Sequence, residues 1–221
     1  MNVLVTGSSK GLGRELALTF ARKGHGVILH GRDEARLAQV RQEIEALPSP
    51  VAVVRGDITD ERTLRHLLDA ARTWKIDVLI NNAGAYLSAP IEETSLLDAE
   101  RILKTNLCTP VWLTLAIYPL FRERGHGLIV NINSLAGKGF NDQEAAYCAS
   151  KWGLRGFMGS FKFEARKHGI SVLDVYLGKM RTDMAANRPG LIEPCEAARV
   201  IYELWRDYPT LRVNEIEIGR A

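Results

Sequence analysis

The sequence predicts an α/β fold: a doubly wound parallel sheet of about seven strands with helices on both faces. Short β-branched apolar runs alternate with longer amphipathic segments along the whole chain. Most of the runs are apolar throughout, which is typical of strands buried on both faces of a sheet. Strict alternation of strand and helix favours parallel pairing, because each parallel connection needs a crossover.

The expected elements follow this alternation in order. Strands are expected at 2–6, 26–30, 51–55, 77–81, 127–132, 171–176 and 215–218. Helices are expected between them, where apolar residues recur at three- and four-residue spacings, at 11–23, 34–47, 60–73, 98–124, 145–168 and 195–208. No linker or repeat interrupts the pattern, and 221 residues suit one domain, so we expect a single domain over residues 1–221.

Composition disfavours several classes of protein. The 29 basic and 26 acidic residues are scattered, which gives no electrostatic footprint for nucleic acid. Cys108, Cys148 and Cys195 form no C-x-x-C pair, which favours reduced thiols and a cytoplasmic location. The histidines lack metal-ligand spacing, so no metal is expected. The longest apolar run, from Val111, is too short to span a bilayer and is broken by Pro119, so we expect no membrane partner.

The first expected strand leads into a glycine-rich turn, "T-G-S-S-K-G-L-G" at residues 6–13. Glycines between a strand and a helix allow backbone N–H groups and the helix N-terminus to approach a pyrophosphate. In doubly wound sheets, ligands bind beyond the carboxyl ends of the strands, where the strand order reverses. An ordinary turn is the alternative. The candidate cofactor contacts here are Gly7, Ser9, Lys10, Gly11, Leu12 and Gly13.

A second candidate site lies in "A-A-Y-C-A-S-K-W-G", residues 145–153. Tyr147 and Lys151 stand four residues apart, so in a helix their side chains share one face. Taken alone, such a pair is a surface contact worth a few tenths of a kcal/mol.

Together these motifs resemble the short-chain dehydrogenase/reductase family, whose fingerprint is T-G-x-x-x-G-x-G. The resemblance extends through "N-N-A-G" at 81–84, Asn106, Ser134, Tyr147 and Lys151, in the family's order and spacing. It covers nearly the whole chain and implies a small, single-domain, dinucleotide-binding oxidoreductase.

The resemblance implies roles for four residues. Reduction of a carbonyl needs a proton donor within reach of the developing alkoxide. Tyr147 would be this general acid, and Lys151, with the oxidised cofactor, would lower the phenol pKa from its usual value of about 10 and bind the nicotinamide ribose. Ser134 would orient the substrate oxygen, and Asn106 would hold a water of a proton relay. Otherwise Ser134 is a turn residue and Asn106 braces a helix kink.

The end of the second strand indicates NADP(H) rather than NAD(H). NAD enzymes usually place an acidic residue there to bind the ribose hydroxyls. This chain has Gly31 followed by Arg32, and Arg32 and Lys10 can form charge-assisted bonds to a 2′-phosphate. The alternative is that both are solvated and that Asp33 reaches a ribose hydroxyl.

Other cofactor contacts are implied by the resemblance alone. They are Asp57 and Ile58 at the adenine, Asn82, Ala83 and Gly84 along the cleft, and Gly178 and Thr182 near the nicotinamide carboxamide. Capping of a helix is the alternative for Asp57. The chain departs from the family at Leu177, which stands where a proline is usual, so the loop lacks the φ restraint of proline.

A substrate lid is expected over about 179–193. Met180, Met184 and Leu191 would supply apolar lining, while Arg181 and Arg188 could contact anions but are better explained as solvated. Further walls are expected from 85–87, 135–143 and Trp152. The short lid suggests an open pocket for varied aldehydes and ketones.

The sequence thus predicts an NADP(H)-dependent oxidoreductase that interconverts a small carbonyl compound and an alcohol. A non-catalytic NADP(H)-sensing protein is the alternative, which the presence of all four reacting groups disfavours. A homodimer or homotetramer is expected, because relatives often pair through the two long helices. Apolar residues on those helices are Leu113, Ile117, Phe157 and Phe161.

Overall fold

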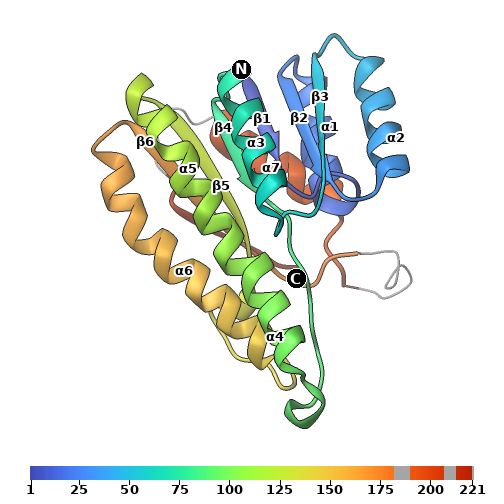
Figure 1. Ribbon diagram of the computed structural model, residues 1–221, viewed down its shortest axis with the longest axis vertical. Helices are drawn as coiled ribbons and strands as arrows, with labels where there is room; N and C mark the ends of the chain where they lie inside the picture. The colour runs from blue at the N-terminus through green and yellow to red at the C-terminus, as the bar shows by residue number, and fades with distance from the viewer. Residues whose placement is uncertain (182–189, 207–212, 221) are drawn as a thin grey trace.

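The computed structural model describes residues 1–181, 190–206 and 213–220. The described residues form one parallel seven-stranded sheet in the order β3-β2-β1-β4-β5-β6-β7 (Figure 1). The strands are β1 (Asn2–Val5), β2 (Gly26–Gly31), β3 (Val51–Arg55), β4 (Val78–Asn81), β5 (Gly127–Ser134), β6 (Ile170–Leu177) and β7 (Glu215–Ile218). The predicted fold class is therefore confirmed. The strand order reverses between β1 and β4, and this reversal opens a binding position at their carboxyl ends.

The helices agree with the sequence prediction except in one place. They are α1 (Gly11–Arg22), α2 (Glu34–Glu45), α3 (Glu61–Thr73), α4 (Leu96–Leu103), α5 (Thr109–Arg124), α6 (Ala145–Arg166) and α7 (Pro194–Arg206). Short 3-10 turns occur at Ile91–Glu93 and Leu135–Gly137. The segment expected as one helix over 98–124 contains a π-helical stretch at Lys104–Cys108, which separates α4 from α5.

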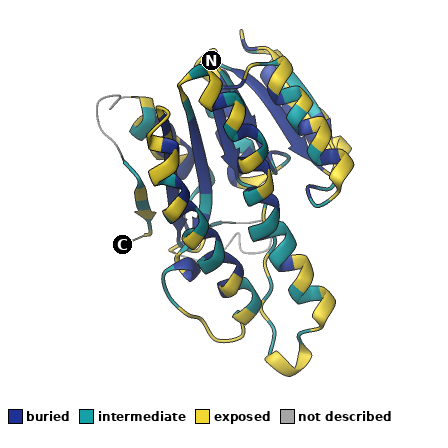
Figure 2. Cartoon of the chain, turned by 60° about the vertical axis from the view of Figure 1, so that its left-hand side comes forward, coloured by how far each residue is buried: buried dark blue, intermediate teal, exposed yellow. Residues whose placement is uncertain are grey.

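Each face of the sheet has its own apolar core. On one face, α1, α2 and α7 bury residues such as Leu16, Val40 and Ile201 against the strands. On the other, α3, α5 and α6 bury residues such as Leu67 and Phe121. Figure 2 shows the buried strands between helices whose outer sides are exposed. Because both faces are covered, the central strands are apolar on both sides.

The apolar residues proposed for an oligomer interface were wrongly chosen. Leu113, Ile117 and Phe161 are at most 7% exposed and belong to the core, and Phe157 packs against it. These residues recur at spacings of four, and the sheet, rather than a second chain, covers that side of each helix. The exposed apolar side chains on the same helices are Trp112, Leu115 and Phe163.

A buried polar row crosses the middle of the sheet. Asn81 of β4, Asn131 of β5 and Asp174 of β6 are neighbours in the strand register. Asn81 donates to Asn131 at 2.9 Å, and Asn131 donates to the Asp174 carboxylate at 3.1 Å. The second carboxylate oxygen of Asp174 is buried without a hydrogen-bond partner. Burial raises the pKa of Asp174 to about 7.

Among the described residues, no helix has the length and apolar character needed to cross a membrane.

Candidate functional site

The glycine-rich turn connects β1 to α1 at the strand reversal. Gly7 has a φ of +66°, and a Cβ there would lie 2.9 Å from the Cα of Ala83. A Cβ on Gly13 would overlap the Gly7 carbonyl oxygen. The turn therefore packs against the chain that follows β4, and only glycine fits at both positions.

One side chain of β2 and one that follows β4 hold this turn from either side of β1. His30, at the end of β2, accepts a hydrogen bond from the Gly7 N–H on Nδ1 at 3.2 Å. Burial lowers the pKa of His30 to about 4, which keeps the ring neutral and able to accept. From the other side, Asn82 donates to the carbonyls of Thr6 and Gly7 at 2.8 and 3.0 Å. Asn82 was a predicted site residue. His30 was missed, although a histidine inside an apolar strand is a visible signal.

The start of α1 suits a phosphate group. The helix begins at Gly11 with Lys10 as its N-cap residue, no side chain caps it, and its first turn has no acidic residue. By contrast, Asp33 and Asp60 cap α2 and α3 with their side chains. An uncapped N-terminus leaves N–H groups and the positive end of the helix dipole for an anion. The turn thus fits the pyrophosphate of a dinucleotide.

Gly31 and Arg32 lie beside this turn. A Cβ on Gly31 would be 3.2 Å from the Ser9 hydroxyl, so a larger residue would crowd Ser9. Arg32 is largely exposed and forms a 3.3 Å ion pair with Asp57. Asp57 also accepts from the backbone of Thr59 at 2.9 Å and does not cap α3, which excludes the capping alternative.

Asp33, the alternative ribose contact, is engaged elsewhere. Its side chain accepts from the Arg36 N–H at 3.1 Å, caps α2, and lies 3.3 Å from the Arg36 guanidinium. The carboxylate therefore already caps its own helix.

Ser134, Tyr147 and Lys151 converge at the carboxyl end of β5. Ser134 ends the strand, and its hydroxyl accepts from the Ala136 N–H at 3.2 Å. A hydrogen bond from Ser134 acts to lower the pKa of the Tyr147 phenol. The Lys151 ammonium lies 5.8 Å from the centre of the Tyr147 ring and donates to the Ile132 carbonyl at 3.2 Å. The sequence-predicted trio is thus assembled at one place.

The chain's own groups raise the pKa of the Tyr147 phenol, and the lowering expected from Lys151 together with the oxidised cofactor stays a prediction. Burial raises the pKa of Tyr147, and the nearby Glu144 carboxylate raises it further. Lys151 is itself buried, and desolvation lowers its pKa to about 8. With a pKa of about 8, the ammonium is still mostly charged at neutral pH and can stabilise a phenolate on Tyr147.

Asn106 lies in the π-helical stretch and ties the loop after β4 to helix α6. Its side-chain oxygen accepts from the Ala85 N–H and its amide donates to the Ala85 carbonyl, both at 2.8 Å. The amide also reaches Ser150 at 3.2 Å, one residue before Lys151. π-Helical turns are often found at functional sites. The bonds of Asn106 join the loop after β4 to α6 beside Lys151, and its role in a proton relay stays a prediction.

Asn133 is a site residue that the sequence reasoning missed. Its side chain accepts from the Ser134 N–H at 2.9 Å and donates to the Lys151 carbonyl at 3.3 Å. It therefore fixes β5 to α6 between two predicted reacting groups. The signal in the sequence is a second asparagine in the apolar strand, two residues after Asn131.

Two loops form the wall above Tyr147. The Tyr86 ring packs edge-on against Tyr147, with 5.1 Å between ring centres, and the Tyr86 hydroxyl donates to Glu144 at 2.7 Å. Nearby, Phe140 stacks on Trp152 at 5.3 Å. The expected walls at 85–87, 135–143 and Trp152 contribute to this region.

The predicted lid is only partly described. Thr182, Met184 and Arg188 lie outside the described residues. Arg181 pairs with Glu193 at 2.6 Å. Leu191 is buried, and Gly178 donates to the Ile218 carbonyl at 2.9 Å, which anchors the start of the lid to β7.

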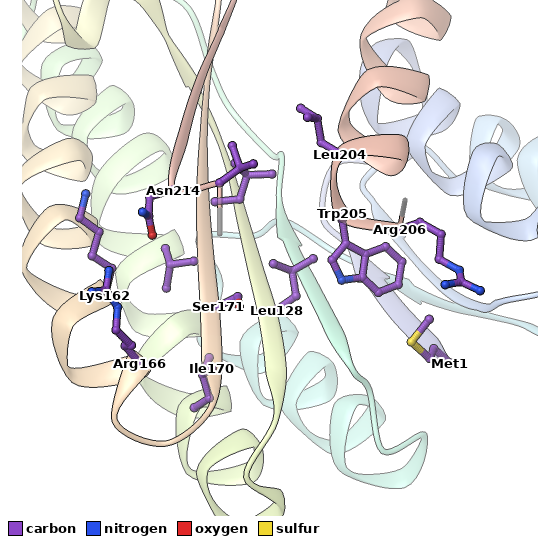
Figure 3. Close-up of a pocket in the computed structure, with 13 residues that line it drawn as sticks. Met1, Leu128, Lys162, Arg166, Ile170, Ser171, Leu204, Trp205, Arg206 and Asn214 are labelled. Carbon is purple, nitrogen blue, oxygen red and sulfur yellow. The ribbon is translucent and has the colours of Figure 1, made fainter. Parts of the chain in front are cut away.

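A cavity of about 300 Å³ lies away from this site, at the opposite ends of the strands (Figure 3). Met1, Leu128, Trp205 and Asn214 are among its lining residues. It contains none of the predicted site residues, and we assign it no role. Within the described ranges, no group of three metal-ligating side chains is assembled.

The glycine turn and the uncapped start of α1 lie at the strand reversal, and a hydroxyl, a phenol and an ammonium converge at the end of β5, two strands away. This combination on a doubly wound sheet defines a class of protein, the dinucleotide-binding oxidoreductases. A family model described as short chain dehydrogenase matches residues 1–190, and the chain belongs to that family.

Known proteins agree with this assignment. Dehydrogenase/reductase SDR family member 7 of Mus musculus is 32% identical over 85% of this chain, and the chain spans 57% of that protein's length. Sepiapterin reductase of Chlorobaculum tepidum is 31% identical over 82% of this chain and 78% of its own length. A metagenomic short-chain oxidoreductase, solved in complex with NADP, superposes with a TM-score of 0.88 at 29% identity, covering 100% of this chain and 97% of its own.

Proposed function

We propose that this chain reduces a ketone or aldehyde to an alcohol with NADPH, and catalyses the reverse oxidation with NADP⁺. The observation that carries the proposal is the convergence of Ser134, Tyr147 and Lys151 at the end of β5, across the strand reversal from the uncapped N-terminus of α1. The reductases and the NADP complex among its relatives support the same reaction class.

In the proposed mechanism, bound NADPH supplies the hydride, and the chain holds the substrate and moves the proton. The Ser134 hydroxyl donates a hydrogen bond to the substrate carbonyl oxygen and orients it. Tyr147 donates its phenolic proton to that oxygen as negative charge develops there. Its raised pKa keeps the phenol protonated at neutral pH, which suits this step. The Lys151 ammonium stabilises the phenolate that remains.

The preference for NADP(H) rests on the surroundings of Gly31. Arg32 and Lys10 supply positive charge beside the turn, and Gly31 offers no carboxylate. Asp33, which could have bound a ribose hydroxyl, is committed to capping α2. We also propose that residues 1–221 form one domain and that the protein acts in the cytoplasm, where its free cysteines would stay reduced.

The test is NADPH oxidation with a panel of aldehydes and ketones by the native chain and by Tyr147→Phe. We expect the variant to lose at least about a hundredfold in kcat, the usual contribution of general acid catalysis. NADPH affinity, measured by fluorescence titration, should change little. Equal rates from both proteins would contradict the mechanism.

A further inference from the structure

We propose that Glu144 makes the substrate site select against anionic carbonyl compounds, so that the preferred substrates are neutral or cationic. This inference rests on the proposed reaction, and it names the class of substrate. Glu144 is thus a specificity-determining residue, and it was not among the sequence-predicted site residues.

The first step of the argument is the position of the carboxylate. Glu144 immediately precedes α6, but its side chain does not cap the helix. The two carboxylate oxygens instead accept from the Tyr86 hydroxyl at 2.7 Å and from the Asn141 amide at 2.8 Å. These two neutral donors fix the negative charge at the loop wall rather than in free solvent.

The second step is its closeness to the reacting group. The ring of Tyr86, which is hydrogen-bonded to Glu144, packs edge-on against Tyr147 at 5.1 Å. The charge of Glu144 is also among the causes that raise the Tyr147 pKa. A charge that disfavours the phenolate also disfavours a carboxylate on a substrate bound at that phenol.

The third step is the absence of compensation. Over the described part of the chain, no ion pair includes Glu144. Tyr86 and Asn141 donate hydrogen bonds but carry no charge, so neither neutralises the Glu144 carboxylate. Tyr86 is 61% exposed, which leaves this surface open to an incoming substrate.

The structure also ties the two loops together near this point. Ala89 donates its N–H to the Gln143 carbonyl at 2.9 Å, next to the bond between Tyr86 and Glu144. The loop after β4 is therefore joined to the loop before α6 by a backbone and a side-chain hydrogen bond. This arrangement holds the Glu144 charge at a fixed place relative to Tyr147.

The test compares three aldehydes of one shape and different charge: methyl 4-formylbenzoate, 4-formylbenzoate and 4-(trimethylammonio)benzaldehyde. Values of kcat/KM with NADPH are measured for the native chain and for Glu144→Gln. We expect Glu144→Gln to raise the kcat/KM for the anionic aldehyde, relative to that for the neutral aldehyde, by about three- to tenfold. This is the size of one partly screened charge interaction. The kcat/KM for the cationic aldehyde, relative to the neutral one, should fall.

Glu123→Gln is the matched control. It removes an exposed carboxylate near the far end of α5, and both kcat/KM ratios should stay within about twofold of the native values. Tyr86→Phe keeps the ring and the Glu144 charge but removes one of the two donors that fix the carboxylate. It should therefore weaken the discrimination between charges, and less than Glu144→Gln does.

Calorimetric titration of the same aldehydes into the complex with NADP⁺ gives a readout without turnover, and the dissociation constants should follow the same order. If Glu144→Gln is active and its kcat/KM ratios equal those of the native chain, the charge selection is overturned and the proposed function is not. No NADPH oxidation by the native chain would sink the proposed function, while the dissociation constants would still decide the selection. If Glu144→Gln fails to fold, salt provides the test on the native chain. Its kcat/KM ratios between charged and neutral aldehydes should move toward one as salt is added, and ratios that do not change with salt would contradict the proposal.

Discussion

Arg32 combines exposure with a weak tether, which suits a side chain that waits for an anionic ligand. Its 3.3 Å bond to Asp57 lies on the surface, where an ion pair contributes little. We expect Arg32→Ala to raise the KM for NADPH about tenfold, since a hydrogen bond to a charged group is worth roughly 1.5–3 kcal/mol. The KM for NADH, which lacks the 2′-phosphate, should change less than about twofold. Steady-state kinetics with both cofactors would measure this, and equal effects on the two would contradict the NADP(H) assignment.

The buried ammonium of Lys151 predicts a pH dependence. Its pKa is lowered to about 8, so the positive charge is present below that pH and is lost above it. We therefore expect reduction to slow on the alkaline side of about pH 8. In Lys151→Arg, the pH at which the rate falls should rise by at least about one unit, because the guanidinium stays charged. The maximal rate should be lower, because the guanidinium is differently shaped. The exposed Lys167→Arg is the control. If the pH at which the rate falls is the same in Lys151→Arg, another group causes the fall.

At the scale of elements, the buried row across β4, β5 and β6 makes stability depend on pH. The folded pKa of Asp174 is about 7, above its usual value of 3.8. The stability that the neutral carboxyl contributes is fully present below about pH 4 and is lost as the pH rises through 7. Asp174→Asn should match the native chain at low pH and exceed its stability at pH 8, on the order of 1–3 kcal/mol.

Urea unfolding at several pH values would test this prediction. The control is Asp69→Asn, which removes an exposed carboxylate on α3 whose partner is Arg72. Parallel stability curves for Asp174→Asn and the native chain would show that Asp174 is not the group responsible.

The strands and helices could be predicted from the sequence because periodicity reports burial directly. The π-helical stretch at Lys104–Cys108 could not, and the partners of its Asn106, Ala85 and Ser150, are distant in the chain. The glycine turn and the reacting trio follow from local motifs. The Tyr86 to Glu144 contact joins residues 58 apart, and nothing local marks either residue.

The main error in the predicted assembly was the choice of which side of α5 and α6 faces solvent. Apolar residues on α5 and α6 show which helix sides are apolar, but the sequence does not show which of those sides the sheet covers. The structure resolves this by burying Leu113 and Ile117 and exposing Trp112 and Leu115.

For the whole molecule, we propose a homodimer or homotetramer that pairs through Trp112, Leu115 and Phe163. Exposed aromatic and aliphatic side chains are typical of such interfaces, and all three of these residues are exposed on α5 or α6. Trp112→Glu combined with Leu115→Glu should reduce the mass found by light scattering to that of one chain. Val200→Glu on α7, which covers the other face of the sheet, should keep the native mass. A native chain that is already monomeric at micromolar concentration would refute the proposal.

The reversal of strand order has one more consequence, which concerns how this protein could change. The proposed cofactor-selecting residues lie beyond β1, β2 and β3, while the charge proposed to select the substrate lies beyond β4 and β5. Among the described contacts, Lys10 and Arg32 share no hydrogen bond with Glu144, so substitution of either set should leave the energetics of the other nearly untouched. Cofactor choice and substrate choice would then be separable traits, which selection or design could alter one at a time.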